Sequence, residues 1–412
     1  MTTDVPRRPR ALVKARVAVY LTFLANGLGF ANLVPRYPEI LVHLGITKAE
    51  FGQAVMFGSV GALVAGLAAS WLITRLTSAR VASVGMMVLG LGLVGAGLAD
   101  SWLVFAVCLA WVGGIDAIVD VAQNAHGLRV ERRWGGSIIT SFHAAWSLGA
   151  VLGAMMGQLM AGAGVPVGLH MLVVLVLLCL VAGTALPWMI PGPDSADRQG
   201  LAEGAAAPHG QEAPGADKGP APSRLVTVVV IAVLGTMCAA AMFPEDVAGS
   251  WSSLLLAEQG AAPGMVGMGL VCLQGTMIVG RLLGDTVIDR LGPRKVIAWG
   301  GVLVAAGMTI ALVIGSVPGT LIGMVVAGTG CAVAVPVAYA AADDIPGLRP
   351  GQGLTIVSWL ARVIMLVSPP VIGWFADAHG TWVALVYGLV GGVVLAVSWP
   401  VLRRRGPRAA SS

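Results

Sequence analysis

The chain has 412 residues, of which 57% are hydrophobic and only 11% are charged, and its mean hydropathy is +0.86. No soluble single domain has such a composition, so a water-soluble globular protein is excluded. The net charge of +5 is distributed over short loops rather than gathered in one basic patch, and it therefore gives no reason to expect nucleic-acid binding.

Twelve apolar stretches follow one another along the chain. A helix needs about 20 residues to cross roughly 30 Å of hydrocarbon, and backbone polar groups in lipid must be paired within the helix. The sequence therefore predicts an all-α, polytopic membrane protein with twelve transmembrane helices. The first six are expected at residues 16–36, 50–72, 80–99, 103–127, 136–163 and 167–189. The second six are expected at residues 224–257, 264–286, 295–315, 319–342, 352–377 and 381–402.

The only long polar segment, residues 190–223, divides the stretches into six and six. It is rich in Ala, Gly and Pro with scattered charges of both signs, so it cannot bury enough apolar surface to fold. We expect a flexible cytoplasmic linker there, between pseudo-symmetric six-helix bundles at residues 16–189 and 224–402.

Two local patterns predict departures from regular helix packing. Pro244 is a candidate break in the seventh stretch, since proline removes a helix hydrogen bond. Gly149, Gly153 and Gly157 form a four-residue stripe in the fifth stretch, which lets helix backbones approach closely.

Basic residues indicate the orientation in the membrane. Most of the 25 Lys and Arg fall at the chain ends and in alternate loops, which the positive-inside rule assigns to the cytoplasm. An even number of spans then places both termini on the cytoplasmic side of a bacterial cell membrane. The five cysteines lie within apolar stretches without metal-like spacing, so neither disulfides nor a metal site is expected.

Two acids in the fourth stretch are the main candidates for chemistry. A charge inside an apolar span costs about 2.5 to 3.5 kcal/mol on insertion scales, so retained charges usually face a cavity or a partner. Asp116, Asp120 and Asn124 follow at intervals of four and share one helix face, with Gln123 adjoining. Neighbouring carboxylates in a low dielectric resist simultaneous ionisation, which suits a proton carrier. We expect Asp120 to carry the coupling proton, with Asp116 second. The alternative is that one acid pairs with a buried Arg or His and only locks helices together.

Further polar and aromatic side chains at depth are candidate substrate contacts. Arg362 is a candidate anion-binding group or counter-ion to an acid. His143 is a candidate partner of either aspartate, a proton relay or a merely satisfied hydrogen-bonding group. Glu245 is a candidate substrate or outer-gate contact, with a solvated helix end as the alternative. The expected substrate-binding set is Asn26, Asn124, His143, Trp146, Glu245, Trp251, Gln274, Tyr339 and Arg362.

A charged loop, Asp289-Arg290-Leu291-Gly292-Pro293-Arg294-Lys295, follows the eighth stretch. Together with the six-plus-six layout, it resembles the major facilitator superfamily, whose two six-helix bundles rock around a central cavity. The corresponding loop after the second stretch, residues 74–80, has lost both the acid and the glycine. Arg281 and Asp285 are one helical turn apart and can pair. The gating residues that we expect are Asp289, Arg290, Arg294, Arg75, Arg281 and Asp285.

Within the superfamily, the fourth and fifth stretches look similar to the fucose-permease-like branch and its uncharacterised bacterial relatives. The similar segments are Asp120-Val-Ala-Gln123-Asn124, Glu131 and Ser141-Phe142-His143-Ala-Ala-Trp146-Ser147-Leu-Gly149. That branch places an acid four residues before an asparagine, which corresponds to Asp120 and Asn124. It also tends to carry a carboxylate in the first span, where this chain has Asn26 and Asn32, so sugar specificity does not carry over.

The sequence thus predicts a monomeric, proton-coupled secondary transporter that moves a small organic solute by alternating access. Its expected partners are the solute, protons and the lipid bilayer, with no cofactor. Motifs such as HExxH and GxxxxGK do not occur in the sequence, so no enzymatic activity is expected. The alternatives are an antiporter that exports an amphipathic metabolite or drug, and a membrane sensor that binds without transport. Substrate and direction stay open.

Overall fold

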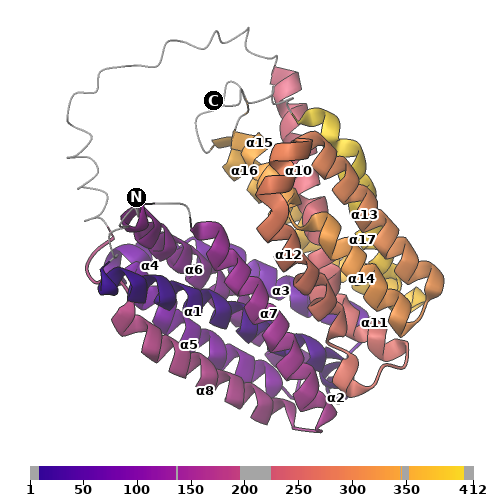
Figure 1. Ribbon diagram of the computed structural model, residues 1–412. Helices are drawn as coiled ribbons and strands as arrows, with labels where there is room; N and C mark the ends of the chain where they lie inside the picture. The colour runs from indigo at the N-terminus through magenta and orange to yellow at the C-terminus, as the bar shows by residue number, and fades with distance from the viewer. Residues whose placement is uncertain (1–8, 136–137, 195–223, 344, 346–351, 403–412) are drawn as a thin grey trace, which may run out of the picture. The chain divides into compact units, whose positions relative to one another are not determined.

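The computed structural model describes residues 9–135, 138–194, 224–343, 345 and 352–402 (Figure 1). Every regular element in these ranges is helical. Twelve helical stretches among them are long and apolar enough to cross a membrane. The prediction of an all-α chain with twelve transmembrane helices is therefore confirmed.

The helices of the sequence's first half keep close to the predicted ranges, but the first span begins earlier and the second is interrupted near residue 67. They are α1 (Arg10–Leu33), η1 (Val34–Arg36), α2 (Tyr37–Leu44), α3 (Lys48–Gly66), α4 (Ala69–Leu76), α5 (Ser78–Gly97), α6 (Trp102–Trp134), α7 (Ile139–Gly162), α8 (Val167–Ala185) and η2 (Leu186–Trp188).

In the second half, the seventh and tenth spans each consist of more than one piece. The elements are α10 (Arg224–Asp246), η3 (Val247–Trp251), α11 (Ser252–Glu258), η4 (Pro263–Met265), α12 (Met268–Leu291), α13 (Pro293–Ile314), α14 (Val317–Cys331), α15 (Ala334–Asp343), α16 (Gln352–His379), α17 (Val383–Ser398) and η5 (Trp399–Val401). The break between α14 and α15 lies just before Pro336, which has no N–H to donate to the carbonyl of Ala332.

The seventh span is irregular in a way that differs from the predicted break. Pro244 lies inside α10 and does not end it. The irregularity is η3, a π-helix of five residues that follows directly and is buried along its whole length. π-Helical turns are rare and often mark functional sites, so η3 is a candidate functional segment.

The chain divides into two compact units. The first consists of Met1–Leu33, Phe57–Gly153 and Val165–Gly215, and the second of Val34–Met56, Ala154–Gly164 and Ala216–Ser412. Residues 34–56 and 154–164 are thus grouped with the second unit, although the predicted N-terminal bundle contains them. The bundles at 16–189 and 224–402 stay a prediction, and residues 195–223 of the predicted linker lie outside the described ranges.

Helices of the first unit pack with their backbones in direct contact. In Figure 1, α1, α5 and α8 run side by side, and α6 packs on α5. A Cβ atom on Gly149 of α7 would lie 2.0 Å from the Leu24 carbonyl oxygen of α1, and one on Gly153 would lie 2.5 Å from that of Leu28. The predicted close approach is confirmed at these two glycines, where no side chain fits without moving the helices apart.

The second unit uses the same device around α13, which packs against α14 and α17 (Figure 1). A Cβ on Gly307 would lie 2.4 Å from the carbonyl oxygen of Gly323, and one on Gly301 would lie 2.2 Å from the backbone nitrogen of Ala396. No side chain fits at these two glycines without moving the helices apart.

Candidate functional site

Three of the predicted site residues form one hydrogen-bonded chain in the first unit. The side-chain amide of Asn26 donates from Nδ2 to Oδ1 of Asp116 over 2.7 Å, and its Oδ1 accepts from Nε1 of Trp146, also at 2.7 Å. Asn26 is buried, with 3% of its surface exposed. These hydrogen bonds join α1, α6 and α7. A change in the protonation of the Asp116 carboxylate would therefore alter a contact between three helices.

Asp120 lies one turn along α6 from Asp116, as the spacing predicts. Its Oδ1 accepts from Nδ2 of Asn124 at 3.0 Å and from Nε2 of Gln123 at 3.4 Å. Its side chain is exposed, whereas that of Gln123 is buried and leaves Oε1 without a hydrogen-bond partner. Among the described residues, neither Asp116 nor Asp120 has a cation within ion-pair distance.

Other predicted substrate contacts are not brought to this chain of hydrogen bonds. The exposed ring of His143 packs edge-on against Phe23, with ring centroids 5.2 Å apart. Arg362 is exposed on α16 and interacts electrostatically with Tyr339 and Cys238. Arg362 and Tyr339 belong to the second unit.

In the second unit, Glu245 is the centre of a polar cluster. Its Oε2 accepts from Nε2 of Gln274 at 3.3 Å, and its Oε1 lies 3.5 Å from a guanidinium nitrogen of Arg281. Gln274 is buried and its Oε1 has no hydrogen-bond partner. Arg281 therefore pairs with an acid in another helix. The expected contact with Asp285 involves a side chain outside the described part of the chain.

A second group of unsatisfied atoms surrounds the π-helix η3. The Oδ1 atom of Asp246 accepts from Oγ of Ser250 at 3.0 Å, while its Oδ2 is buried without a partner. Trp251 is completely buried, and its Nε1 has no acceptor. Its ring packs edge-on against Phe51, which in turn packs edge-on against Tyr37. An unsatisfied buried polar group costs about 1–3 kcal/mol, so these atoms call for a partner such as water or a solute.

Tyr37 and Phe51 were not predicted to belong to this cluster. Both lie more than 190 positions before Trp251 in the chain, and apolar periodicity says nothing about such distant pairs. Tyr37 also interacts electrostatically with Asp246, as does Tyr387. Of this region, the sequence pointed only to Glu245 and Trp251 as site residues.

Two of the predicted gating residues, Arg294 and Arg75, contact tryptophan rings close to them in the structure. Arg294 donates to the backbone oxygens of Leu402 and Pro400, and its guanidinium lies 5.8 Å from the ring centroid of Trp399. Arg75 lies 5.7 Å from the centroid of Trp71. Arg294 thus fastens the end of the last span to the start of α13. The side chains of Asp289 and Arg290 are exposed at the end of α12.

Another polar cluster in the second unit was missed entirely. Asp377, at the end of α16, accepts from the backbone N–H groups of Lys48 and Ala49 at 2.8 and 2.9 Å, and so caps the start of α3. The ammonium group of Lys48 pairs with Glu258, which also accepts from the backbone and hydroxyl of Thr381. Two carboxylates therefore hold one helix start, and no motif in the sequence announces them.

A cavity of about 480 Å³ lies in the first unit, between the N-terminal end of α1, Arg133 and residues 187–191. None of the predicted substrate-binding side chains lines it.

Known proteins similar to this chain are membrane transporters. Residues 225–412 match the family model described as Major Facilitator Superfamily. An uncharacterised MFS-type transporter of Yersinia pestis is 25% identical over 389 residues, covering 94% of each chain. An uncharacterised transporter of Sinorhizobium fredii is 27% identical over 389 residues, covering 93% of this chain and 96% of its own. These matches support a transporter of the major facilitator superfamily.

Solved structures of the superfamily share the fold. A variant of the nucleoside transporter NupG superposes with a TM-score of 0.70 at 13% identity, covering 95% of this chain and 99% of its own. A D-xylose-proton symporter gives 0.67 at 15% identity, with coverages of 93% and 97%. FucP in the outward conformation gives 0.59 at 18% identity, with coverages of 96% and 100%. These identities show the fold alone. The twelve apolar helices together with the family model and the relatives support a multi-pass membrane transporter.

Proposed function

We propose that this chain is a proton-coupled secondary active transporter that moves a small organic solute by alternating access. The observation that carries the proposal is the pair of carboxylates in α6. Asp116 and Asp120 lie one turn apart inside an apolar span, and the partners described for them are neutral amides. Acids that lie inside an apolar span and meet neutral partners suit a carrier that gains and loses one proton in each cycle.

The two acids have different surroundings, which supports different roles. The partners of Asp120 are side chains of its own helix, so it can change protonation without disturbing a contact between helices. Asp116 is linked to α1 and α7 through Asn26, so a change in its protonation would affect how the three helices pack. We assign proton binding to Asp120 first and to Asp116 second.

For the solute, we propose a small polar molecule that carries hydroxyl groups. The unsatisfied buried atoms of the second unit include two acceptors, Oδ2 of Asp246 and Oε1 of Gln274, and a donor, Nε1 of Trp251. A hydroxyl group both donates and accepts, so a solute such as a sugar or nucleoside can satisfy both kinds. The neighbouring aromatic rings suit the apolar face of such a molecule. A nucleoside transporter and a proton symporter for D-xylose have the same fold, which supports this choice.

The membrane orientation is part of the same proposal. The bias of Lys and Arg toward alternate loops supports cytoplasmic termini in the cell membrane. We also propose that the monomer is the transporting unit.

Reconstitution in liposomes tests the function. Purified protein is reconstituted with an imposed pH gradient, and labelled sugars, nucleosides and amphipathic compounds are screened for accumulation. We expect a hydroxyl-bearing solute to accumulate in wild-type vesicles. Asp120→Asn should abolish accumulation driven by the gradient and leave counterflow exchange of the same solute. Accumulation retained in this variant would remove Asp120 as the coupling group. Solute binding without flux would contradict transport and favour a sensor.

A further inference from the structure

The two charged loops have the same backbone although their sequences differ. Thr77, between α4 and α5, has φ 79° and ψ 149°, and Gly292, between α12 and α13, has φ 79° and ψ 151°. This conformation is almost confined to glycine, yet the first loop adopts it with a β-branched residue. Both loops therefore make the same sharp backbone turn, which we call the corner, although the first loop has Thr77 where the second has Gly292.

The first loop also lacks the acid, because Thr74 stands where the second has Asp289. The hydroxyl of Thr74 donates to the carbonyl of Ser70 in its own helix. Thr77, the residue before α5, caps none of the helix's N–H groups with its side chain. Gly292 likewise gives α13 no side-chain cap, so in both loops the first N–H groups of the helix are open to an acceptor from elsewhere in the chain.

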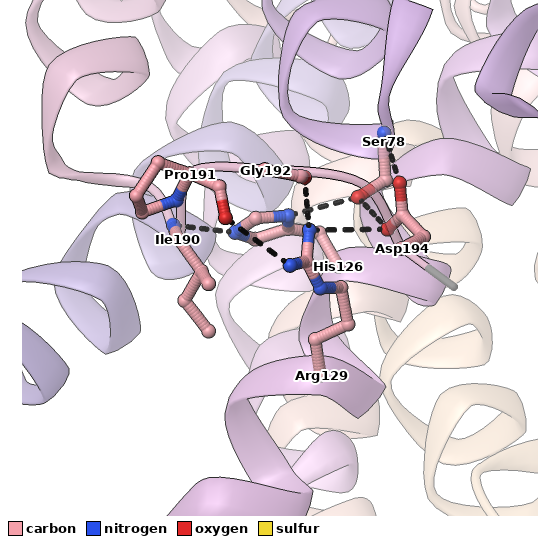
Figure 2. A network of polar contacts seen from close by, with 7 residues as sticks. All are labelled: Ser78, His126, Arg129, Ile190, Pro191, Gly192 and Asp194. Carbon is pink, nitrogen blue, oxygen red and sulfur yellow. Dashed lines mark hydrogen bonds and ion pairs between the residues drawn. The ribbon is translucent and has the colours of Figure 1, made fainter. Parts of the chain in front are cut away.

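Asp194 supplies such an acceptor to α5 from the segment that follows the sixth span. Its Oδ2 accepts from the backbone N–H of Ser78 at 2.8 Å, and its Oδ1 accepts from the Ser78 hydroxyl (Figure 2). Ser78 is the first residue of α5, where a negative charge is favoured by the helix dipole. A residue 116 positions away thus performs the capping that the loop itself does not.

Two buried side chains of α6 hold the same segment, residues 190–194, which we call the strap. The guanidinium of Arg129 contacts Oδ1 of Asp194 and the carbonyl of Gly192 at 3.3 Å each, and the carbonyl of Pro191 at 3.4 Å. Only 1% of Arg129 is exposed. An arginine buried this deeply is stable only when it is paired and hydrogen-bonded, which ties its position to that of the strap.

His126 completes the network and fixes its direction (Figure 2). Its Nε2 lies 3.1 Å from the backbone nitrogen of Ile190, which can only donate, so this ring nitrogen is an acceptor. The proton is then on Nδ1, which donates to Oγ of Ser78 at 2.9 Å. The Ser78 hydroxyl is left to donate to Asp194. Each donor in this series meets an acceptor, as expected of a built junction.

We propose that Asp194 is a positioning residue that takes the place of the acid missing from the first charged loop. Through Ser78 and Arg129 it makes α5, α6 and the strap move as one part during the transport cycle. This inference rests on the proposed transport function, because a part that moves as one has a role only if the protein goes through a transport cycle. It adds a role for a residue outside the apolar spans.

The test compares three variants with wild type. Asp194→Asn keeps the size of the side chain and removes its charge. Asp194→Glu is the conservative replacement. The third adds Thr74→Asp and Thr77→Gly to Asp194→Asn and so restores the acid and glycine in the loop. Uptake rate and KM are measured in proteoliposomes per folded protein, and amide hydrogen exchange is followed over residues 78–81 and 189–194. Asp100→Asn, a change of an exposed acid in the α5–α6 loop, is the matched control.

We expect Asp194→Asn to lower the maximal uptake rate by about ten-fold or more with KM unchanged, and to speed exchange at both segments. Asp194→Glu and the restored loop should each recover most of the rate. A wild-type rate and wild-type exchange in Asp194→Asn would overturn the inference. Failure of the restored loop to recover the rate would also overturn the inference, because an acid at position 74 would then not replace Asp194. If wild type moves no solute, the proposed transport function fails, while the exchange data still decide whether Asp194 holds the strap.

Discussion

Thr77 is the residue whose backbone is most at odds with its side chain. Its φ of 79° is the only positive value among the non-glycine residues that the structure describes. Such a conformation costs about 1–3 kcal/mol for a residue with a side chain, and glycine relieves it at an entropic cost of about 0.5–1 kcal/mol. Thr77→Gly should therefore raise the free energy of unfolding by about 1 kcal/mol, as measured by thermal unfolding in detergent.

The matched control is the reverse change in the other loop. A Cβ on Gly292 would meet nothing within 4 Å, so Gly292→Thr adds backbone strain without a clash. It should lower stability by about 1–3 kcal/mol. Equal stability of both variants and wild type would mean that the corner relaxes in solution, and the kinship of the two loops would lose its support.

Asn26 is the residue on which the buried hydrogen-bonded chain depends. Asn26→Leu has a similar volume but leaves the Asp116 carboxylate and the Trp146 indole without their partner. Asp116 and Trp146 are half-buried, so each lost partner should cost toward the lower end of about 1–3 kcal/mol, and we expect a loss of about 2 kcal/mol in the free energy of unfolding. Trp146→Phe removes only one of the two bonds and should cost about half as much. A loss below about 0.5 kcal/mol for Asn26→Leu would show that water replaces the amide without penalty.

At the scale of elements, the α1–α7 crossing depends on missing side chains. Gly149→Ala would place a methyl group 2.0 Å from the Leu24 carbonyl oxygen, so the helices must separate. We expect a loss of about 1–3 kcal/mol in thermal unfolding experiments. Gly183→Ala in α8 is the control, because nothing lies within 4 Å of its Cβ. It should stabilise the protein by about 0.5–1 kcal/mol through helix propensity. Similar effects of the two changes would contradict the described crossing.

The elements also show which features a sequence can reveal. The number and approximate limits of the spans follow from bilayer thickness, which sets a length that hydropathy makes visible. The interruption before Pro336 and the π-helix after Asp246 are local backbone events within apolar stretches, and hydropathy does not register them.

Partner choice was the least predictable feature of the candidate site. The shared face of Asp120 and Asn124 could be predicted because it lies within one helix. The contact between Asn26 and Asp116 spans 90 positions and depends on how α1 and α6 pack. Likewise, Arg281 meets Glu245 of another helix, a contact that spacing along one helix cannot reveal. Helix periodicity fixes faces, and only tertiary packing decides which faces meet.

At the scale of the whole molecule, the proposed cycle links a proton site in the first unit to solute contacts in the second. Transport then requires that the proton and the solute change sides together, because each must favour the same state of the protein. The coupling of proton movement to solute movement, rather than either binding event, therefore defines the proposed function.

Solute-driven proton movement measures that coupling directly. Vesicles containing a pH-sensitive dye and the reconstituted protein receive the transported solute with no imposed pH gradient. We predict that solute addition changes the internal pH in wild-type vesicles, and that Asp120→Asn vesicles exchange the solute with no pH change. Solute movement in wild type without any proton movement would contradict the account.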